Sequence, residues 1–413
     1  MTKGECIKYF KSIQSDIFEK VCSLQKRKRV CNVSNLFNTM IYSSFGDNKE
    51  CNFSHLYKSN RYLTESTRSY WRSKIYDLSF DFNEYSYATN NNIISNASVP
   101  TDFKHIYDKY NLLAIDLTKT KTAYRNKSGK GKNLANVGIS AMFNIRNQLF
   151  PSYNVTNDNN EINGLLEHNL SKKDLIILDR YYASYELFDK LKKKTNFIVR
   201  LKKNLKVVKN FIKSSELSKT TNIEGTRLKL VKYWIDKTTK KIIYDKYSEE
   251  GTLSEEDQSD CFILATNLTN LSIDECIYIY KKRWDIEIAF KQLKQNFRIR
   301  YPCQTIRSKQ PLKKCLFWYM MSFLMFNLSS ILKNIIDTDN NINCKFSDCA
   351  RFVRLFLIGK IKMRDVNDEI NKINKNRYTK IYTKIYTREI KAGTLKSINK
   401  INSINELYNE HVG

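Results

Sequence analysis

The order of apolar runs between residues 111 and 201 constrains the fold more than any other feature of this 413-residue sequence. Short apolar runs bounded by polar residues are typical of buried strands. Five such runs occur, at 112–117 (LLAIDL), 136–147 (NVGISAMFNIRN), 149–155, 175–178 (LIIL) and 197–201 (FIVRL). Helices are expected at 160–170 and 184–192. The resulting order, β-β-β-α-β-α-β, predicts an α/β domain with a mixed sheet, because hairpin-linked strands precede helix-linked strands.

The pattern changes after this segment. Residues 204–270 alternate apolar and polar side chains, so we expect them to be all-β and inserted into the α/β domain. Beyond about residue 305, apolar helices run to about 337. The apolar run at 315–325 is too short and too polar at its flanks for a membrane span, so we interpret it as a core helix. The repetitive tract TKIYTKIYT at 379–387 fits a strand, a DNA-contacting segment or low-complexity drift.

The first hundred residues look helical and polar. Residues 63–75 resemble the second helix of a helix-turn-helix, in which Arg68 and Arg72 would face phosphates. A basic, solvated helix has the same pattern.

The net charge of +29, from 71 basic and 42 acidic residues, calls for a polyanionic partner, and nucleic acid is the leading candidate. An AT-rich genome also enriches Lys, Asn and Ile, in which this chain is rich, so the charge supports nucleic acid without establishing it. The ten cysteines are scattered with no CxxC pair, which favours reduced thiols inside a cell. The N-terminus, MTKGECIKYF, has no apolar core segment, so no signal peptide is expected.

One helix carries an unusual polar stripe. Residues 279–295 (IYKKRWDIEIAFKQLKQ) contain no Gly or Pro and have apolar residues at helical spacing. At roughly 100° per residue, four polar side chains fall within an arc of about 60°. These are Tyr280, Arg283, Glu287 and Lys294. Apolar residues cover much of the remaining circumference, so the helix should be largely buried.

Three acids could meet at one site. Asp116 and Asp179 each follow an apolar run at a strand end, where chemistry collects in α/β sheets, and Glu287 lies in the striped helix. Singly, each has an ordinary explanation: a turn or helix cap for the aspartates, and an ion pair with Lys291 for Glu287. Together, converging carboxylates would repel one another unless cations lay between them. Carboxylate ligands suit Mg²⁺ or Mn²⁺, and two such ions serve phosphodiester chemistry.

With these residues in place, the chain resembles the DDE transposases of bacterial insertion sequences, in the superfamily with the Tyr-(2)-Arg-(3)-Glu-(6)-Lys signature. The stripe matches that spacing at all four positions. LLAIDLTKT is similar to the family's first-aspartate strand, and LIILDRYYASYELFDKL with NFIVRLKKN is similar to its second-aspartate block. The resemblance covers roughly residues 110–300. The chain departs from the family at Leu117 and at Arg180–Tyr181, where a small residue often follows each aspartate.

The resemblance implies a ribonuclease-H-like catalytic fold with a β-rich insertion between the second Asp and the Glu. It implies that Asp116, Asp179 and Glu287 are catalytic and bind two Mg²⁺ or Mn²⁺ ions. It places DNA contacts on the stripe and near the second aspartate. The expected DNA-binding residues there are Tyr280, Arg283, Lys291, Lys294 and Arg180. Trp284 could stack on a base or pack in the core.

The implied activity is cut-and-paste DNA transposition: hydrolysis at element ends, then strand transfer by the freed 3′-hydroxyl. A homodimer would pair two ends of double-stranded DNA. Two alternatives remain, a domesticated or decayed transposase that only binds DNA, and a metal-dependent nuclease without strand transfer. We expect an intracellular protein with no membrane partner, in the cytoplasm or nucleoid of a prokaryote or the nucleus of a eukaryote.

The expected organisation has four parts. They are a helical DNA-end-binding domain at 1–108, a ribonuclease-H-like domain at 109–203 and 271–335, a β-rich insertion at 204–270, and a basic C-terminal region at 336–413.

Overall fold

The computed structural model of the chain forms two compact units, Met1–Phe80 with Met325–Gly413, and Asp81–Leu324. The structure describes residues 3–24, 33, 36–38, 40–41, 65–78, 100–125, 132–156, 161–244, 246, 254, 256, 260–297, 299, 311–338, 344–357, 359, 362 and 368. The repetitive tract at 379–387 lies outside this range. The expected division into four parts stays a prediction.

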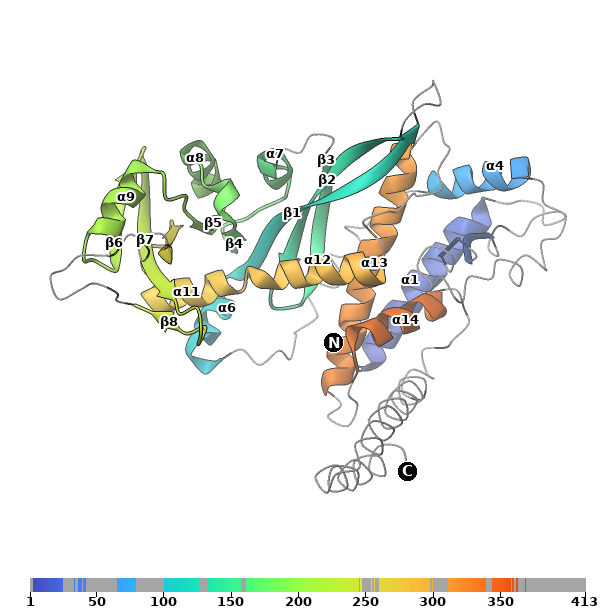
Figure 1. Ribbon diagram of the computed structural model, residues 1–413. Coiled ribbons are helices and arrows are strands. Elements are labelled where there is room, and N and C mark those ends of the chain that lie inside the picture. Colours follow the sequence, from blue (N-terminus) through green and yellow to red (C-terminus); the bar gives the residue numbers. More distant parts are fainter. Residues whose placement is uncertain are drawn as a thin grey trace, which may run out of the picture. The chain divides into compact units, whose positions relative to one another are not determined.

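The second unit is built on one mixed, nine-stranded sheet (Figure 1). The strand order is β3-β2-β1-β4-β5-β9-β7-β6, and β8 pairs with β7 alone. The strands are β1 Asn111–Arg125, β2 Lys132–Asn144, β3 Leu149–Thr156, β4 Asp174–Leu178, β5 Asn196–Arg200, β6 Ser218–Ile223, β7 Thr226–Ile235, β8 Ile242–Ile243 and β9 Phe262–Thr266. β4 is parallel to β1 and β5 is parallel to β4, whereas the other pairs are antiparallel.

Helices complete the unit. They are the short η1 Thr101–Phe103, α6 Lys104–Lys109, α7 Glu161–Leu166, η2 Arg180–Tyr182, α8 Tyr185–Lys194, α9 Lys206–Lys213, α11 Ile273–Lys281, α12 Trp284–Asn296 and the first half of α13 Pro311–Thr338. Apolar side chains of β1, β4 and β5 form one core with those of α7, α8 and α9. All five residues of β4 are buried, which explains why the four after Asp174 form an uninterrupted apolar run, LIIL.

The topology confirms the predicted α/β fold. An antiparallel meander, β1 to β3, is followed by two strands parallel to β1, with α7 before β4 and α8 before β5. This arrangement is ribonuclease-H-like. Each of the five predicted strands and both predicted helices is present, although the helix expected at 160–170 ends at Leu166.

The segment predicted to be all-β also contains a helix, so that prediction is wrong at its start. In α9, Val208, Phe211 and Ile212 are buried at helical spacing, which outweighs any strand-like alternation. The strands of this segment do not form a separate sheet. β9 pairs with β5, and β7 pairs with β9, so they extend the central sheet.

The helix predicted at 279–295 is in fact two helices. α11 begins with a capping box between Ser272 and Glu275 and ends at Lys281. The N–H groups of Lys282 and Arg283 then donate to carbonyls three residues earlier, which tightens the chain before α12 begins. The expectation of a largely buried helix holds for one face of α12 only, the face with Ile286, Ala289, Phe290 and Leu293.

The first unit is helical where it is described. It contains α1 Lys3–Ser23, α4 Glu65–Tyr76, α14 Phe346–Leu357 and the second half of α13 Pro311–Thr338. Phe10 of α1 packs edge-on against Phe356 of α14, with ring centroids 5.8 Å apart. Leu316–Ile336 of α13 is long and apolar enough to cross a membrane, but 89% of its apolar window is buried, as for the core helix that we expected.

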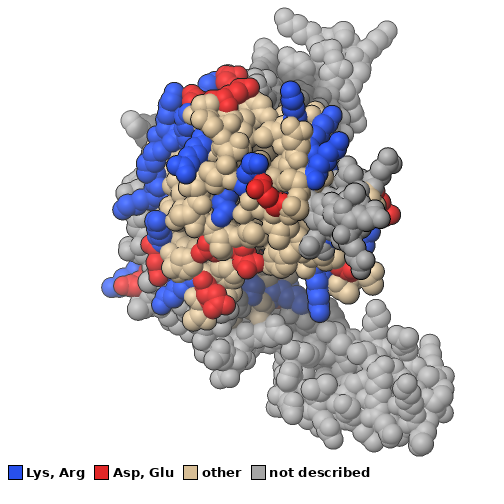
Figure 2. Space-filling view, turned by 90° about the vertical axis from the view of Figure 1, so that its left-hand side faces the viewer, with Lys and Arg blue, Asp and Glu red and all other residues tan. Residues whose placement is uncertain are grey.

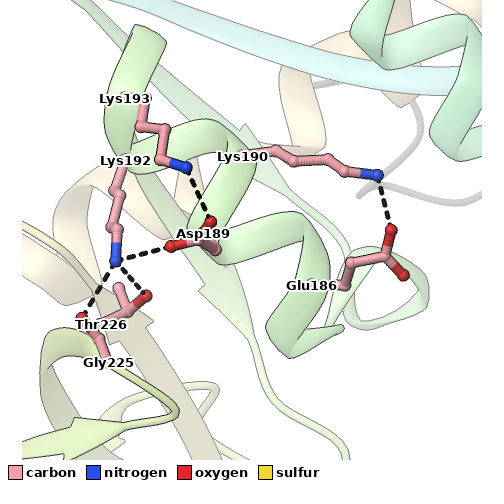
Figure 3. Close-up of polar contacts among 7 residues, drawn as sticks. All are labelled: Glu186, Asp189, Lys190, Lys192, Lys193, Gly225 and Thr226. Carbon is pink, nitrogen blue, oxygen red and sulfur yellow. Dashed lines mark hydrogen bonds and ion pairs between the residues drawn. The ribbon is translucent and has the colours of Figure 1, made fainter.

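A lysine joins α8 to the β6–β7 hairpin (Figure 3). The hairpin turns through Glu224 and Gly225, both with positive φ, which suits a two-residue connection. Lys192 Nζ donates to the Gly225 carbonyl at 3.0 Å and to Thr226 Oγ1 at 3.2 Å, and it lies 2.7 Å from Asp189 Oδ1. This contact therefore ties the extension of the sheet to a helix of its centre.

We expect Lys192→Ala to lower the free energy of unfolding by about 1 kcal/mol, because two hydrogen bonds to the hairpin are lost. Lys193→Ala is the matched control, since Lys193 contacts Asp189 on the same helix but not the hairpin. Urea denaturation of both variants measures the difference. Equal effects of the two substitutions would show that the hairpin contact adds no stability.

Candidate functional site

The register between β1 and β4 places two aspartates next to each other. Ala114 pairs with Ile177, and Asp116 and Asp179 each lie two residues further on. Neighbouring strands are about 4.8 Å apart, so the two side chains start from adjacent positions. β4 ends just before Asp179, but β1 continues to Arg125 through its pairing with β2. The expectation that Asp116 ends its strand is therefore wrong, since backbone pairing continues beyond the apolar run.

An arginine links the third acid to the first. Arg283 Nη2 donates to Glu287 Oε1 at 2.5 Å, and Arg283 Nη1 lies 4.0 Å from Asp116 Oδ2. The Arg283 side chain is only 15% exposed. Three elements that are far apart in the sequence thus bring Asp116, Asp179 and Glu287 into one charged cluster, with a guanidinium among them.

The environment of Asp116 disfavours its charged form. Burial raises the pKa of this carboxyl to about 6. A hydrogen bond from the Leu117 N–H, at 2.8 Å, and the charge of Arg283 lower the pKa, whereas the charges of Asp179 and Glu287 raise it. Burial and like charge therefore outweigh the single nearby guanidinium, and the cluster can accept further positive charge.

The donor set suits a divalent metal ion, but its present arrangement does not. Carboxylate oxygens are the ligands that Mg²⁺ and Mn²⁺ prefer. Within the described part of the chain, no three Asp, Glu, His or Cys side chains are placed to hold a metal ion together. Glu287 is instead paired with Arg283. A metal ion bound by Glu287 together with the aspartates would require the Arg283–Glu287 pair to open. At present the guanidinium supplies the positive charge that Glu287 needs.

The remaining stripe residues divide between the interior and the surface. Tyr280 is buried and interacts with Arg283, and burial raises the pKa of its hydroxyl to about 12. Lys291 and Lys294 are exposed on α12, where Lys294 Nζ lies 5.9 Å from the centre of the Phe290 ring. The stripe is therefore buried at Tyr280 and exposed at Lys291 and Lys294.

Trp284 lies at the surface with 59% of its area exposed, so the core-packing interpretation is wrong. The reason is the orientation of α12, whose buried side begins at Ile286. Ile288, four residues after Trp284, is 45% exposed on the same outer face. An exposed apolar pair therefore occupies the positions of α12 that directly follow Arg283 and Glu287 in the sequence.

Basic and aromatic residues also follow the second aspartate. Arg180 is exposed, and Tyr181 is 50% exposed with Lys202 Nζ 5.7 Å from the centre of its ring. Arg68 and Arg72 belong to α4 in the first unit, and their side chains lie outside the described residues.

Two residues near the acids were missed from the sequence. Glu161, the first residue of α7, interacts electrostatically with Asp116 and Asp179. The Tyr182 hydroxyl interacts with the same three carboxylates, and its side chain is fully buried. Glu161 follows a polar stretch and Tyr182 looks like an ordinary core aromatic, so no local pattern marks either one.

The surface charge alone does not locate a binding face. Figure 2 shows the side of the second unit that carries α9 and the β6–β7 hairpin. Lys and Arg side chains gather mainly toward its margins, Asp and Glu are interspersed, and uncharged residues cover much of the middle. A net charge of +29 therefore does not make this face uniformly basic.

We expect Asp116→Asn to stabilise the metal-free protein at pH 8. The raised pKa means that the folded state retains the Asp116 proton longer than the unfolded state, so wild-type stability falls as pH rises from about 4 to about 6. A shift of this size corresponds to about 3 kcal/mol. The gain from the substitution should reach that order at pH 8 and vanish below pH 4, where both states are protonated.

Urea denaturation in EDTA across this pH range measures the gain. Asp108→Asn is the control, because Asp108 is an exposed aspartate away from the cluster. A destabilised Asp116→Asn protein at pH 8 would contradict the account of the buried charge.

The segment that holds the three acids is similar to a known protein family. Residues 107–310, which contain all three acids, match the family model described as "Transposase DDE domain". No curated protein matches the chain. Similar solved structures include a piggyBac transposase synaptic complex with hairpin DNA, determined by cryo-EM, at 13% identity and a TM-score of 0.45, covering 89% of this chain and 84% of that one.

Proposed function

Because residues 107–310 match the family model of a transposase DDE domain, we propose that this chain is a cut-and-paste DNA transposase. The observation that carries the proposal is the convergence of Asp116, Asp179 and Glu287 from β1, the end of β4 and α12. A structural ion pair needs one acid and one base, whereas this cluster places three acids around one guanidinium. The excess of negative charge fits a site that recruits cations.

The three carboxylates would hold the metal. Transposases of this family use divalent ions, and we propose two Mg²⁺ or Mn²⁺ ions here. Bound ions would offset phosphate charge and favour attack on the phosphodiester. Arg283 would have two roles: it neutralises Glu287 and Asp116 before the ions bind, and afterwards its planar guanidinium can bind a DNA phosphate bidentately.

The DNA would follow the exposed side of α12. Lys291 and Lys294 lead away from the acids on that helix, and each can contact a phosphate as a point charge. The exposed Trp284 ring suits stacking on an unpaired base. Arg180 would contact DNA beside Asp179, while Tyr280 would position Arg283 and reach the backbone only if the site rearranges. Arg68 and Arg72 of α4 would bind the element ends.

Two chemical steps would follow on double-stranded DNA. Water would first attack a phosphodiester at an element end and release a 3′-hydroxyl. That hydroxyl would then attack the opposite strand, giving a hairpin, or the target DNA. Because both ends must be cut together, the active form would be a homodimer with two DNA ends, inside the compartment that holds the host DNA.

The test is cleavage and strand transfer in vitro on this gene with its native flanking DNA, with Mg²⁺ or Mn²⁺. We expect excised linear DNA and transfer products from the wild type, and a loss of at least about 100-fold for Glu287→Gln, as for removal of other groups that stabilise charge in a reaction. Glu186→Gln is the control, since Glu186 is an exposed acid on α8 that pairs with Lys190.

Each alternative gives a different result. Specific binding of the ends without cutting would identify a decayed or domesticated transposase. Cutting without any strand-transfer product would identify a nuclease. Equal cutting by wild type and Glu287→Gln would contradict the assignment of Glu287.

A further inference from the structure

An aromatic ring lies at the surface shortly after the second aspartate. Tyr181 is the second residue of η2, and half of its area is exposed. Asp179 lies two residues earlier, so chain length alone keeps the two Cα atoms within about 7 Å of each other. The N–H of Tyr182 donates to the Asp179 carbonyl at 3.0 Å, which closes this segment into a tight turn. The backbone therefore holds Tyr181 beside Asp179.

The Tyr181 ring packs against buried structure. It meets the ring of Tyr182 edge-on, with centroids 6.2 Å apart and an angle of 86° between the ring planes. Tyr182 is fully buried in the core that β4, β5 and α8 share. A packed neighbour limits the orientations of an exposed ring, so less entropy is lost when a ligand binds to it. The Tyr181 ring is therefore a preorganised surface for a flat ligand.

A lysine from the neighbouring strand's loop reaches the same ring. Leu178 of β4 pairs with Val199 of β5, so the loops that follow these two parallel strands leave the sheet at the same edge. Lys202 lies in the loop after β5, and its Nζ atom is 5.7 Å from the centre of the Tyr181 ring. Ligands of open α/β sheets bind outside the carboxyl ends of parallel strands, which is where this pair lies.

The charge of the two loops fits a phosphate. Residues 179–183 and 201–205 contain three basic residues, Arg180, Lys202 and Lys203, and one acid, Asp179. The side chains of Arg180 and Lys202 are exposed. An exposed aromatic ring with cations beside it suits single-stranded nucleic acid, because a base stacks on the ring while phosphates pair with the cations. A base inside a duplex is already stacked and paired, so this arrangement favours an unpaired base.

We propose that Tyr181 and Lys202 form a binding site for one unpaired nucleotide of a DNA strand next to Asp179, with the base stacked on the Tyr181 ring and the phosphate paired with Lys202. The inference rests on the proposed function and deepens it, because it specifies an unpaired strand on the Asp179 side of the acids. Trp284 of α12 would be a separate stacking position. A nucleotide held at Tyr181 would keep the strand open beside the bond that is cut.

Photocrosslinking of the full chain tests the site without relying on activity. The probe is a single DNA strand of about 12 nucleotides that carries 5-iododeoxyuridine, bound in EDTA so that no cutting occurs. Ultraviolet light joins iodouracil to an aromatic side chain that stacks on it, and mass spectrometry of the peptides identifies that residue. We expect a crosslink to Tyr181 in the wild type. The position is read from the wild-type protein, so the result does not depend on how a variant folds.

Variants separate the ring from the charge. Tyr181→Phe should crosslink at the same position, whereas Tyr181→Leu should lower the yield of crosslinked peptide at least about tenfold, as for loss of one base–aromatic stack. Tyr244→Leu is the matched control, because Tyr244 is another exposed tyrosine of the same unit, whose hydroxyl donates to Asp274. Lys202→Gln should reduce the salt dependence of the Tyr181 crosslink by about one phosphate contact. Lys209→Gln, at an exposed position of α9, should leave it unchanged.

The crosslinked position distinguishes this inference from the proposed function. A crosslink to Trp284 without one to Tyr181 would overturn the Tyr181 site and leave the proposed function standing. An equal crosslink to Tyr181 from a blunt duplex of the same sequence would overturn the preference for an unpaired base. Absence of binding to both the single strand and the duplex would overturn the proposed function as well.

Discussion

The site depends on one electrostatic constraint: partly buried carboxylates cannot remain charged side by side without a cation. Arg283 supplies that cation through its contacts with Glu287 and Asp116. The position of Arg283 follows from the tightened backbone at Lys282 and Arg283, directly before α12 begins. From there its guanidinium contacts both Glu287 and Asp116. The register of β1 and β4 supplies the adjacent aspartates. Sheet pairing and the helix break are therefore both required to assemble the charge.

The same guanidinium offsets part of the charge that the acids carry, so the second unit can fold without further cations. A buried acid without compensation would destabilise the fold, and Asp116, with its pKa raised to about 6, retains part of that cost. Divalent ions carry more charge than one guanidinium and would compete with it for the carboxylates. Displacement of Arg283 would then leave a phosphate-binding group beside the site, so metal binding and DNA binding would be coupled through a single side chain.

The sequence predicts those elements whose structure depends mainly on their own side chains. Apolar runs identified β1, β4 and β5 because buried parallel strands need apolar side chains on both faces. Helical spacing identified the stripe. The errors arose where tertiary contacts decide: Trp284 is exposed because α12 buries another face, and Asp116 lies within a longer strand because β2 continues to pair with it. Glu161 and Tyr182 interact electrostatically with the acids, and no spacing along the chain reveals that.

The most direct measurement is a crystal structure of the protein with Mn²⁺, in which anomalous scattering locates the ions. The account places Mn²⁺ among Asp116, Asp179 and Glu287, with the Arg283 guanidinium moved away from Glu287. Mn²⁺ bound elsewhere, or an intact Arg283–Glu287 pair at saturating Mn²⁺, would show that the arginine is a permanent part of the cluster and would contradict the central claim.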